Sequence, residues 1–471
     1  MNGMDVKGKR VLVVGLGKSG VASALFLQSR GARVTVSDTR SEHQLRQEIP
    51  TLLDRGIAIE AGGHGERTFR DQDLIVVSPG VPTDVPPLAR ARSWGLPVIG
   101  EVELAARYLR GRVIAITGSN GKTTTTTLCG DLIAASGQKI LVGGNIGTPV
   151  ILLVEHSSDD TINVLEISSF QLETIEIFHP QVAVVLNVTP DHLDRHGTFE
   201  AYVDAKARIF KNQTSSDWAV LNLDNVVTAG MKARTQAKVC WFTRGALAEA
   251  HDCGSFVRDH RIFWRQGGRE IEIMPVKDIP LKGGHNLENV LAAVCVARLA
   301  GCDAGSIHQS VKAFKAVDHR LQLVATIKGV EYYNDSKATN VDATIKAIES
   351  FPGNIHLILG GKDKDSDYST MNELLRQRVK RVYTIGSAAE KIRSQVASAV
   401  EIVPCGTLEV AVERSVEGAT EGDIVLLAPA CSSFDQFENY EHRGRVFRKL
   451  VESRAENTTS MLRESQEWRN A

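Results

Sequence analysis

The sequence predicts an α/β protein made of three consecutive sections. Short β-rich runs alternate with helical stretches over almost all of the 471 residues, a pattern that favours helices packed on parallel sheets. Two of these runs lead into glycine-rich turns, and several others end in small polar residues. A chain of this length holds two to four domains. We place the sections at residues 1–110, 111–318 and 319–471.

Composition excludes several classes of protein. Hydrophobic residues make up 42% of the chain and the net charge is −1, as in an ordinary globular protein. No apolar run is long enough to span a bilayer, no apolar segment follows the basic residues at the start, and no long basic block occurs. We therefore expect a cytoplasmic protein that has neither a membrane nor a nucleic acid as partner. The seven cysteines form no C-x-x-C pair and are expected to be reduced.

A glycine turn closes the first strand of the first section. A strand over residues 10–15, a helix over 21–31 and a strand over 33–38 are predicted, and Gly15, Gly17 and Gly20 fit the pattern G-x-G-x-x-G. Asp38 follows near the spacing at which an acidic residue meets a ribose. Such a turn lets the backbone approach a pyrophosphate. The pattern suits an NAD-dependent dehydrogenase, or another nucleotide bound by the same kind of turn.

A second glycine turn opens the second section. The strand over residues 112–117 leads into "GSNGKTT", and the five threonines after Lys122 are predicted to begin a helix. Backbone N–H groups and a helix N-terminus at such a turn bind phosphate, Lys122 would reach the outer phosphates, and the Thr123 hydroxyl would hold Mg²⁺. Position 116 is isoleucine, so the turn is shorter than a full Walker A motif. Two phosphate-type turns weaken the dehydrogenase interpretation, because hydride transfer needs no ATP.

Polar residues follow the ends of most later strands. Ligands of open α/β sheets bind beyond the carboxyl ends of the strands, so we expect the chemistry there. The segments concerned are 73–82 and 97–109 in the first section, 162–172, 182–197, 218–225 and the helical 283–301 in the second, and 316–322, 329–340, 355–365, 381–386 and 423–437 in the third. The last twenty residues are polar and are expected to be peripheral.

The motifs together resemble one family. "GSNGKTT", "GNIG", "EISSFQL", "NVTPDHLDRH", "AKARIF", "HNLENVLAA", "DSKATN" and "PACSSFDQF" are similar to motifs of the Mur ligases, which build the peptide stem of the bacterial cell wall by ATP-driven amide formation. Within the family the chain resembles the branch that adds D-glutamate to UDP-N-acetylmuramoyl-L-alanine. The resemblance implies a Rossmann-like N-terminal domain, a central P-loop-type ATP-binding α/β domain and a Rossmann-like C-terminal domain, in a monomer.

The resemblance also implies a role for each site residue. The UDP-substrate would be bound by Gly15, Leu16, Gly17, Lys18, Ser19, Asp38, Thr39, Arg40, Ser78, Pro79, Gly80 and Asn145. ATP would be bound by Gly118, Ser119, Asn120, Gly121, Lys122, Thr123, Thr124, Asn286, Arg320, Asp335 and Lys337. D-Glutamate would be bound by Thr339, Lys364, Ser433, Phe434 and Tyr440, of which Phe434 and Tyr440 differ from some family members that have leucine and phenylalanine there. Lys362 is an alternative to Lys364 as the lysine that binds D-glutamate, and the motif alignment favours Lys364.

The metal and catalytic residues follow from the same resemblance. Mg²⁺ would be held by Thr123, Glu166, His192 and Lys206, and catalysis would depend on Lys122, Asn145, His192 and Lys206. Glu166 ends a strand-like run, which suits a metal ligand. His192 is either a ligand of a second Mg²⁺ or a base near the incoming amine, and the resemblance favours the metal. Composition alone would make Lys206 an exposed helix residue, whereas the resemblance implies a carbamate on its amine.

The implied reaction is an ATP-driven ligation. Phosphoryl transfer to the carboxylate of the L-alanine end gives an acyl phosphate, the amine of D-glutamate attacks it, and phosphate leaves. Closure of the third domain is expected to exclude water from the acyl phosphate. Three alternatives stay open: an NAD-dependent dehydrogenase, a regulatory nucleotide-binding module without catalysis, and a neighbouring Mur ligase with another amino acid.

Overall fold

The computed structural model describes residues 4–315 and 318–470, with side chains described to residue 455. The chain forms two compact units. The first unit comprises the chain to Val188 with Glu200–Asp278 and Glu288–Lys312. The second comprises Thr189–Phe199, Ile279–Leu287 and the chain from Ala313 on. No helix within the described ranges combines the length and the apolar character that a membrane crossing requires.

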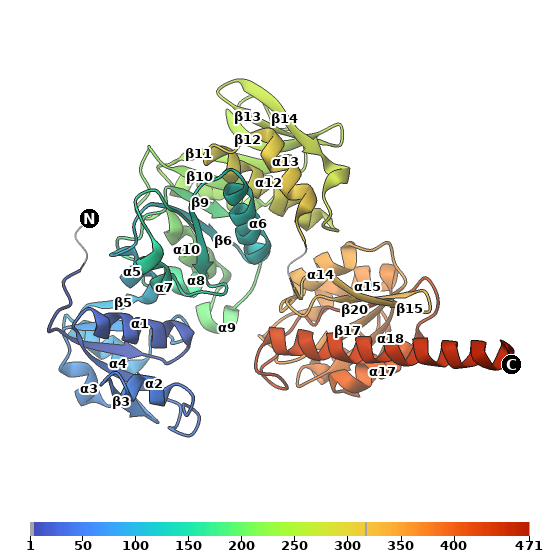
Figure 1. Ribbon diagram of the computed structural model, residues 1–471, viewed down its shortest axis with the longest axis horizontal. Helices are drawn as coiled ribbons and strands as arrows, with labels where there is room; N and C mark the ends of the chain where they lie inside the picture. Colours follow the sequence, from blue (N-terminus) through green and yellow to red (C-terminus); the bar gives the residue numbers. More distant parts are fainter. Residues whose placement is uncertain (1–3, 316–317, 471) are drawn as a thin grey trace. The chain divides into compact units, whose positions relative to one another are not determined.

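The first unit begins with a five-stranded parallel sheet, drawn in blue in Figure 1, and its strands lie in the order β3-β2-β1-β4-β5. Its strands are β1 Arg10–Val14, β2 Arg33–Asp38, β3 Ala58–Ala61, β4 Leu74–Val77 and β5 Val98–Gly100. Its helices are α1 Lys18–Ser29, α2 Ile49–Leu53, α3 Glu66–Arg70, α4 Pro86–Ser93 and α5 Glu101–Ala106. The central strands β1 and β4 are almost continuously apolar because helices cover both faces of the sheet. The predicted strand-turn-helix order of this section is confirmed.

A nine-stranded sheet forms the rest of the first unit, in the order β14-β13-β12-β11-β10-β9-β6-β8-β7. Its strands are β6 Arg112–Thr117, β7 Ile140–Gly144, β8 Ile162–Glu166, β9 Val182–Val185, β10 Trp218–Asn222, β11 Lys238–Thr243, β12 Cys253–Arg258, β13 Arg261–Gln266 and β14 Arg269–Pro275. The helices of this region are α6 Lys122–Ala135, α7 Val150–Leu153, α8 Ser169–Leu172, α10 Phe199–Ala207, α11 Val226–Gly230, α12 Gly284–Leu299 and α13 Ala304–Ala313.

One edge of this sheet departs from the parallel pattern. Strands β12, β13 and β14 pair antiparallel, whereas β6 to β11 pair parallel. Both connections are two-residue turns with positive φ, at Asp259–His260 and at Gly267–Gly268. Such turns match the twist of the strands that they join. This extension was not predicted from the sequence, although the Gly-Gly pair between two β-rich runs is a hairpin signal.

The second unit contains a six-stranded sheet in the order β15-β16-β20-β17-β18-β19. Its strands are β15 Gln322–Ile327, β16 Val330–Asn334, β17 Ile355–Gly360, β18 Val379–Ile385, β19 Glu401–Gly406 and β20 Ile424–Leu427. Its helices are α9 Leu193–His196, α14 Val341–Glu349, α15 Asn372–Arg378, α16 Ala389–Val396, α17 Leu408–Gly418 and α18 Tyr440–Asn470. Only the edge strand β15 runs antiparallel to its neighbour.

Alternating side chains give this sheet two cores. Leu357 and Leu426 belong to the core that α14, α15 and α16 cover, while Ile358 and Leu427 belong to the core under α17 and α18. This is the period of two that strands impose. The polar C-terminal residues continue α18 as far as Asn470, and their side chains beyond residue 455 lie outside the described part.

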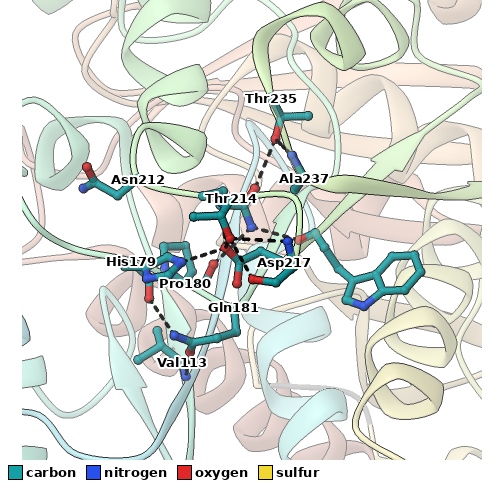
Figure 2. Close-up of polar contacts among 12 residues, drawn as sticks. Val113, His179, Pro180, Gln181, Asn212, Thr214, Asp217, Thr235 and Ala237 are labelled. Atoms are coloured by element: carbon teal, nitrogen blue, oxygen red, sulfur yellow. Dashed lines mark hydrogen bonds and ion pairs between the residues drawn. The ribbon is translucent and has the colours of Figure 1, made fainter.

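A polar cluster ties together the amino-terminal ends of β9 and β10 (Figure 2). His179 Nε2 lies 2.7 Å from Asp217 Oδ2, and the same oxygen accepts hydrogen bonds from the N–H and the hydroxyl of Thr214. Asp217 is buried. Burial favours the neutral acid, but the hydrogen bonds from His179 and Thr214 outweigh it and lower the pKa of Asp217. The cluster therefore secures the end of the sheet away from the glycine turn.

We expect Asp217→Ala to destabilise the protein by about 2 kcal/mol, because it leaves several donors without their buried acceptor. Urea unfolding of the full chain measures the effect. Asp159→Ala is the control, since the ion pair of Asp159 with Arg110 is exposed and should contribute nothing measurable. Equal effects of the two substitutions would contradict the role assigned to the cluster.

Candidate functional site

The second glycine turn lies where strand β6 passes into helix α6. The strand ends at Thr117, the helix begins at Lys122, and Gly121 between them has a φ of 86°. The positive φ at Gly121 favours glycine, and a Cβ atom there would lie 2.2 Å from Asn289 Oδ1 and would displace that side chain. The predicted strand, turn and helix are confirmed, and the turn has the form that presents backbone N–H groups to a phosphate.

Two lysines from different elements converge on this turn. Lys122 Nζ donates to the carbonyls of Gly118 and Ser119, at 2.9 and 3.0 Å. Lys206 Nζ, on α10, donates to Gly118 O at 2.8 Å and lies 4.5 Å from the centre of the Tyr202 ring. Lys206 is only 1% exposed. The interpretation from composition alone, an exposed helix lysine, is therefore wrong.

The carboxylate of Glu166 joins two other predicted site residues. Glu166 is the last residue of β8 and is buried. Its Oε2 accepts a hydrogen bond from the Thr123 hydroxyl, and its Oε1 accepts one from the Asn145 side-chain amide, both at 2.8 Å. Three residues that lie far apart in the sequence thus form one hydrogen-bonded set beside the phosphate turn.

This set fits Mg²⁺. Hydroxyl and carboxylate oxygens are the ligands that Mg²⁺ prefers, and it is commonly held by one or two carboxylates together with substrate phosphates. Within the described residues, no three His, Cys, Asp and Glu side chains gather in a geometry suited to a metal ion. A metal at this place would therefore depend on Thr123, Glu166 and the phosphates of a bound nucleotide.

Two asparagines that the sequence analysis missed support the turn. Asn187 follows β9; its Oδ1 accepts from Asn120 N at 2.8 Å, and its carbonyl accepts from Ser119 N at 2.9 Å. Asn289 Oδ1 accepts from the Thr125 hydroxyl. The position of Asn187 after an apolar strand was a signal that could have identified it.

The first glycine turn is held in shape by its neighbours. Gly15 has a φ of 87°, and Ser78 donates its hydroxyl hydrogen to Gly15 O at 2.7 Å. A Cβ atom at Gly20 would lie 1.9 Å from Gly15 O, so helix α1 approaches the turn more closely than any other residue would permit. Lys18 and Thr39 are exposed beside it, as are the neighbouring Gly17 and Gly80.

Asp38 braces this turn rather than facing solvent. One oxygen accepts from Leu16 N at 2.7 Å, and the other accepts from Arg40 N at 2.8 Å. The Arg40 guanidinium also donates to the carboxylate. Burial raises the pKa of Asp38, but the hydrogen bonds from Arg40 and Leu16 outweigh burial and leave it below the ordinary value.

A cavity of about 520 Å³ opens beside the same turn. Its lining comes from the start of α1, from the α2 region, and from the loop that leads into α7. The lining residues are Leu16, Gly17, Lys18, Val21, Ala22, Leu25, Gln47, Glu48, Thr51, Gly147, Thr148, Pro149 and Leu152. Three predicted UDP-substrate residues therefore share a cavity with the segment that follows Asn145.

Glu101 contacts helix α7, whose residue Leu152 lines this cavity. Its Oε1 accepts a hydrogen bond from Ile151 N at 2.7 Å, and its Oε2 is buried without a hydrogen-bond partner. Burial raises the pKa of Glu101 to about 7. Nearby, Glu103 Oε2 accepts from the backbone N–H groups of residues 176–178. Neither carboxylate was predicted as a site residue, because nothing in the local sequence shows that both are buried.

In the second unit, the segment around His192 lies beside predicted D-glutamate residues. His192 has a φ of 54° and precedes α9. Its neighbour Asp191 accepts from Lys364 Nζ at 3.4 Å and from the Asn340 side-chain amide at 2.8 Å. The structure thus brings together His192 and Lys364 through Asp191, which the sequence analysis did not single out.

Other predicted residues of this unit lie at the carboxyl ends of β16 and β20. Asp335 is buried, with Arg320 Nη1 at 3.8 Å, and burial raises the pKa of Asp335 to about 6 although Arg320 opposes the shift. Lys337 Nζ lies 5.1 Å from the centre of the Tyr440 ring.

The exposure of the remaining predicted residues varies. Ser433 is buried, whereas Phe434 is 69% exposed. Thr339 is half-buried. Asn286 is buried, and its amide donates to Lys282 O at 2.6 Å.

The comparisons with known proteins all point to one family. Three family models match the chain: the Mur ligase MurD-like N-terminal domain over residues 9–100, the Mur ligase middle domain over 116–297, and the Mur ligase glutamate ligase domain over 319–431. The UDP-N-acetylmuramoylalanine–D-glutamate ligase of Koribacter versatilis is 62% identical over 96% of this chain and 99% of its own. The chain belongs to the Mur ligase family. The ligase of the same name from Acidobacterium capsulatum is 60% identical over 95% of this chain and 97% of its own.

Solved structures show the same Mur ligase fold at low sequence identity. A pseudomurein peptide ligase type C from Methanothermus fervidus has a TM-score of 0.59 at 20% identity, over 95% of this chain and all of that one. The UDP-N-acetylmuramate-alanine ligase of Thermotoga maritima has a TM-score of 0.58 at 19% identity, over 94% of this chain and 99% of its own. The expected three-domain α/β class is confirmed.

We expect Glu101→Gln to flatten the dependence of stability on pH. The pKa of Glu101 is raised in the folded state, so the folded protein binds a proton that the unfolded chain has lost between about pH 4.5 and 7. Wild-type stability should therefore fall across this window as the pH rises. Thermal unfolding at pH 5 and pH 8 should show a smaller difference in the variant than in the wild type, and an unchanged difference would contradict the assignment.

Proposed function

We propose that this chain joins D-glutamate to UDP-N-acetylmuramoyl-L-alanine with cleavage of ATP to ADP and phosphate, in the synthesis of peptidoglycan precursors. The observation that carries the proposal is the hydrogen-bonded set of Thr123, Glu166 and Asn145 beside the phosphate turn. The relatives that match nearly the whole chain carry the name of this ligase. Mur ligase family models match residues 9–100, 116–297 and 319–431.

The chemical problem is that a carboxylate is a poor electrophile. Transfer of the terminal phosphoryl group of ATP to the alanine carboxylate gives an acyl phosphate, whose carbonyl carbon the neutral amine of D-glutamate attacks. The amine loses a proton, the tetrahedral intermediate expels phosphate, and an amide remains. Two anions must meet in the first step, so cationic and N–H groups aimed at the phosphates are expected to supply most of the catalysis.

The first unit supplies groups of the required kinds. The N–H groups of the turn Gly118–Thr124 and the Lys122 ammonium would bind the ATP phosphates. Thr123 and Glu166 would hold Mg²⁺, which when bound neutralises phosphate charge. Asn145 would orient the alanine end of the UDP-substrate. The cavity beside Leu16, Gly17 and Lys18 would accept the nucleotide part.

Lys206 would act as a carbamate. Its buried amine already reaches the phosphate turn at Gly118 O. Reaction of the neutral amine with CO₂ forms an N–C bond and releases a proton, which turns a cation into a carboxylate-like ligand. A bare ammonium at this place would oppose a bound Mg²⁺, and the carbamate removes that repulsion.

The second unit would bind the nucleotide and the amino acid. Asn286, Arg320, Asp335 and Lys337 are the proposed ATP contacts. Thr339, Lys364, Ser433, Phe434 and Tyr440 are the proposed contacts to D-glutamate, whose two carboxylates suit the Lys364 ammonium and hydroxyl donors. For His192, which lies beside Asp191, we propose a metal-side role rather than that of a base.

The first expected result is phosphate release that depends on D-glutamate. The assay contains ATP, Mg²⁺ and UDP-N-acetylmuramoyl-L-alanine, and compares D-glutamate with L-glutamate, L-alanine and lysine. Only D-glutamate should release phosphate and give a ligated product in the mass spectrum. Retention of NAD without any ligation would instead favour the dehydrogenase alternative.

The second expected result concerns CO₂. Removal of dissolved CO₂ and bicarbonate should lower the wild-type rate, and added bicarbonate should restore it. Lys206→Ala should lower kcat at least about a hundredfold at any bicarbonate concentration. Lys211→Ala, at an exposed lysine that follows the same helix, is the control and should behave as the wild type. A wild-type rate indifferent to CO₂ would contradict the carbamate.

A further inference from the structure

Arg443 is a completely buried arginine in the first turn of α18. Its guanidinium is directed at backbone and hydroxyl oxygens. Nε donates to Ser336 Oγ at 3.0 Å, and Nη2 donates to Ser336 O at 2.8 Å and to Cys431 O at 3.2 Å. Nη1 donates to Ser432 O at 3.4 Å. One planar group therefore makes four hydrogen bonds to two separate segments.

These two segments are neighbouring strand ends. Ser336 follows β16, and Cys431 and Ser432 follow β20. The strands pair in parallel, with Asn334 opposite Leu427, so both loops emerge at the same edge of the sheet. The first loop carries Asp335 and Lys337, and the second leads directly into Ser433. Arg443 thus lies beneath proposed contacts to both ATP and D-glutamate, although its own guanidinium is directed at the loops.

Further contacts draw α18 and a third loop into the same cluster. The Ser336 hydroxyl donates to Tyr440 O at 2.8 Å, and Asn334 Nδ2 donates to Gly444 O at 3.0 Å. The loop after β17 joins through Lys362 N, which donates to Ser432 O at 2.9 Å. The start of α18 is therefore hydrogen-bonded to the loops after β16 and β20, and the loop after β20 is hydrogen-bonded in turn to the loop after β17, which carries Lys364.

The shape of the guanidinium explains why an arginine occupies this position. Burial lowers the pKa of Arg443 to about 10, so the guanidinium is still charged at neutral pH. The four hydrogen bonds offset the cost of removing this charge from water. A rigid fork holds acceptors on two loops in a fixed geometry, whereas the three donors of a lysine ammonium lie on a flexible stem and fix that geometry less well. An apolar side chain could fill the same space but would leave the separation of the loops undefined.

We propose that Arg443 is a positioning residue of the ligase: it fixes the loops at 335–339 and 431–433 in one arrangement, so that ATP and D-glutamate meet them together. The identity of the two ligands rests on the proposed function. The arrangement of the loops rests on the hydrogen bonds alone.

The test compares Arg443→Lys with Arg454→Lys, the same change in the same helix at an exposed arginine paired with Glu413. For Arg443→Lys we expect the KM for D-glutamate to rise about tenfold or more and kcat to fall, while the KM for the UDP-substrate stays within about twofold. Arg454→Lys should match the wild type. A variant that was merely less stable would lose active enzyme without a change in KM, so an unchanged KM for D-glutamate would overturn the proposal.

Hydrogen exchange separates this inference from the proposed function. Amides at 336–339 and 431–434 should exchange faster in Arg443→Lys than in Arg454→Lys, whether or not the wild type ligates D-glutamate. Equal exchange in these loops would refute the positioning role, whereas a wild type without D-glutamate-dependent phosphate release would refute only the proposed function. Should Arg443→Lys fail to fold, Ser336→Ala decides the question, because it removes the acceptor of Nε and should shift KM and exchange in the same direction.

Discussion

The phosphate turn and the residues around it depend on the hydrogen bonds that the Glu166 carboxylate accepts. Glu166 ends a buried strand and holds the Thr123 hydroxyl on one oxygen and the Asn145 amide on the other. Because β8 and β6 are parallel neighbours, their carboxyl ends place Glu166 beside the phosphate turn. The same carboxylate thereby connects the group that would meet Mg²⁺ with the residue that would meet the substrate.

The predicted site residues lie mostly in loops that follow the carboxyl ends of strands. Different side chains hold these loops in place. The first glycine turn is braced by Asp38 and Ser78, and the phosphate turn by Asn187 and two lysines. The loops of the second unit are joined by one buried guanidinium. In each case hydrogen bonds to the loop backbone offset the free-energy cost of burying a polar group. These bonds also hold each loop in one defined conformation.

Two carboxylates show how a buried charge responds to its partners. Asp38 faces Arg40 and two backbone N–H groups, and its pKa is lowered despite burial. Glu101 has backbone donors on one oxygen and none on the other, so burial dominates and its pKa is raised to about 7. The opposite pKa shifts of the two carboxylates cannot be predicted from the sequence, because the number of hydrogen-bond donors around a carboxylate depends on which segments pack against it.

The sequence by itself determined the α/β class, both glycine turns, the position of Glu166 at a strand end and the family, because these depend on local patterns of apolar residues, glycines and motif spacing. The burial of Lys206 and the contacts of Asp191 and Glu101 came only from the tertiary structure. Each depends on segments distant in the chain. Arg443 reads as an ordinary charged residue of a polar helix, and only packing against two strand-end loops makes it a buried link between them.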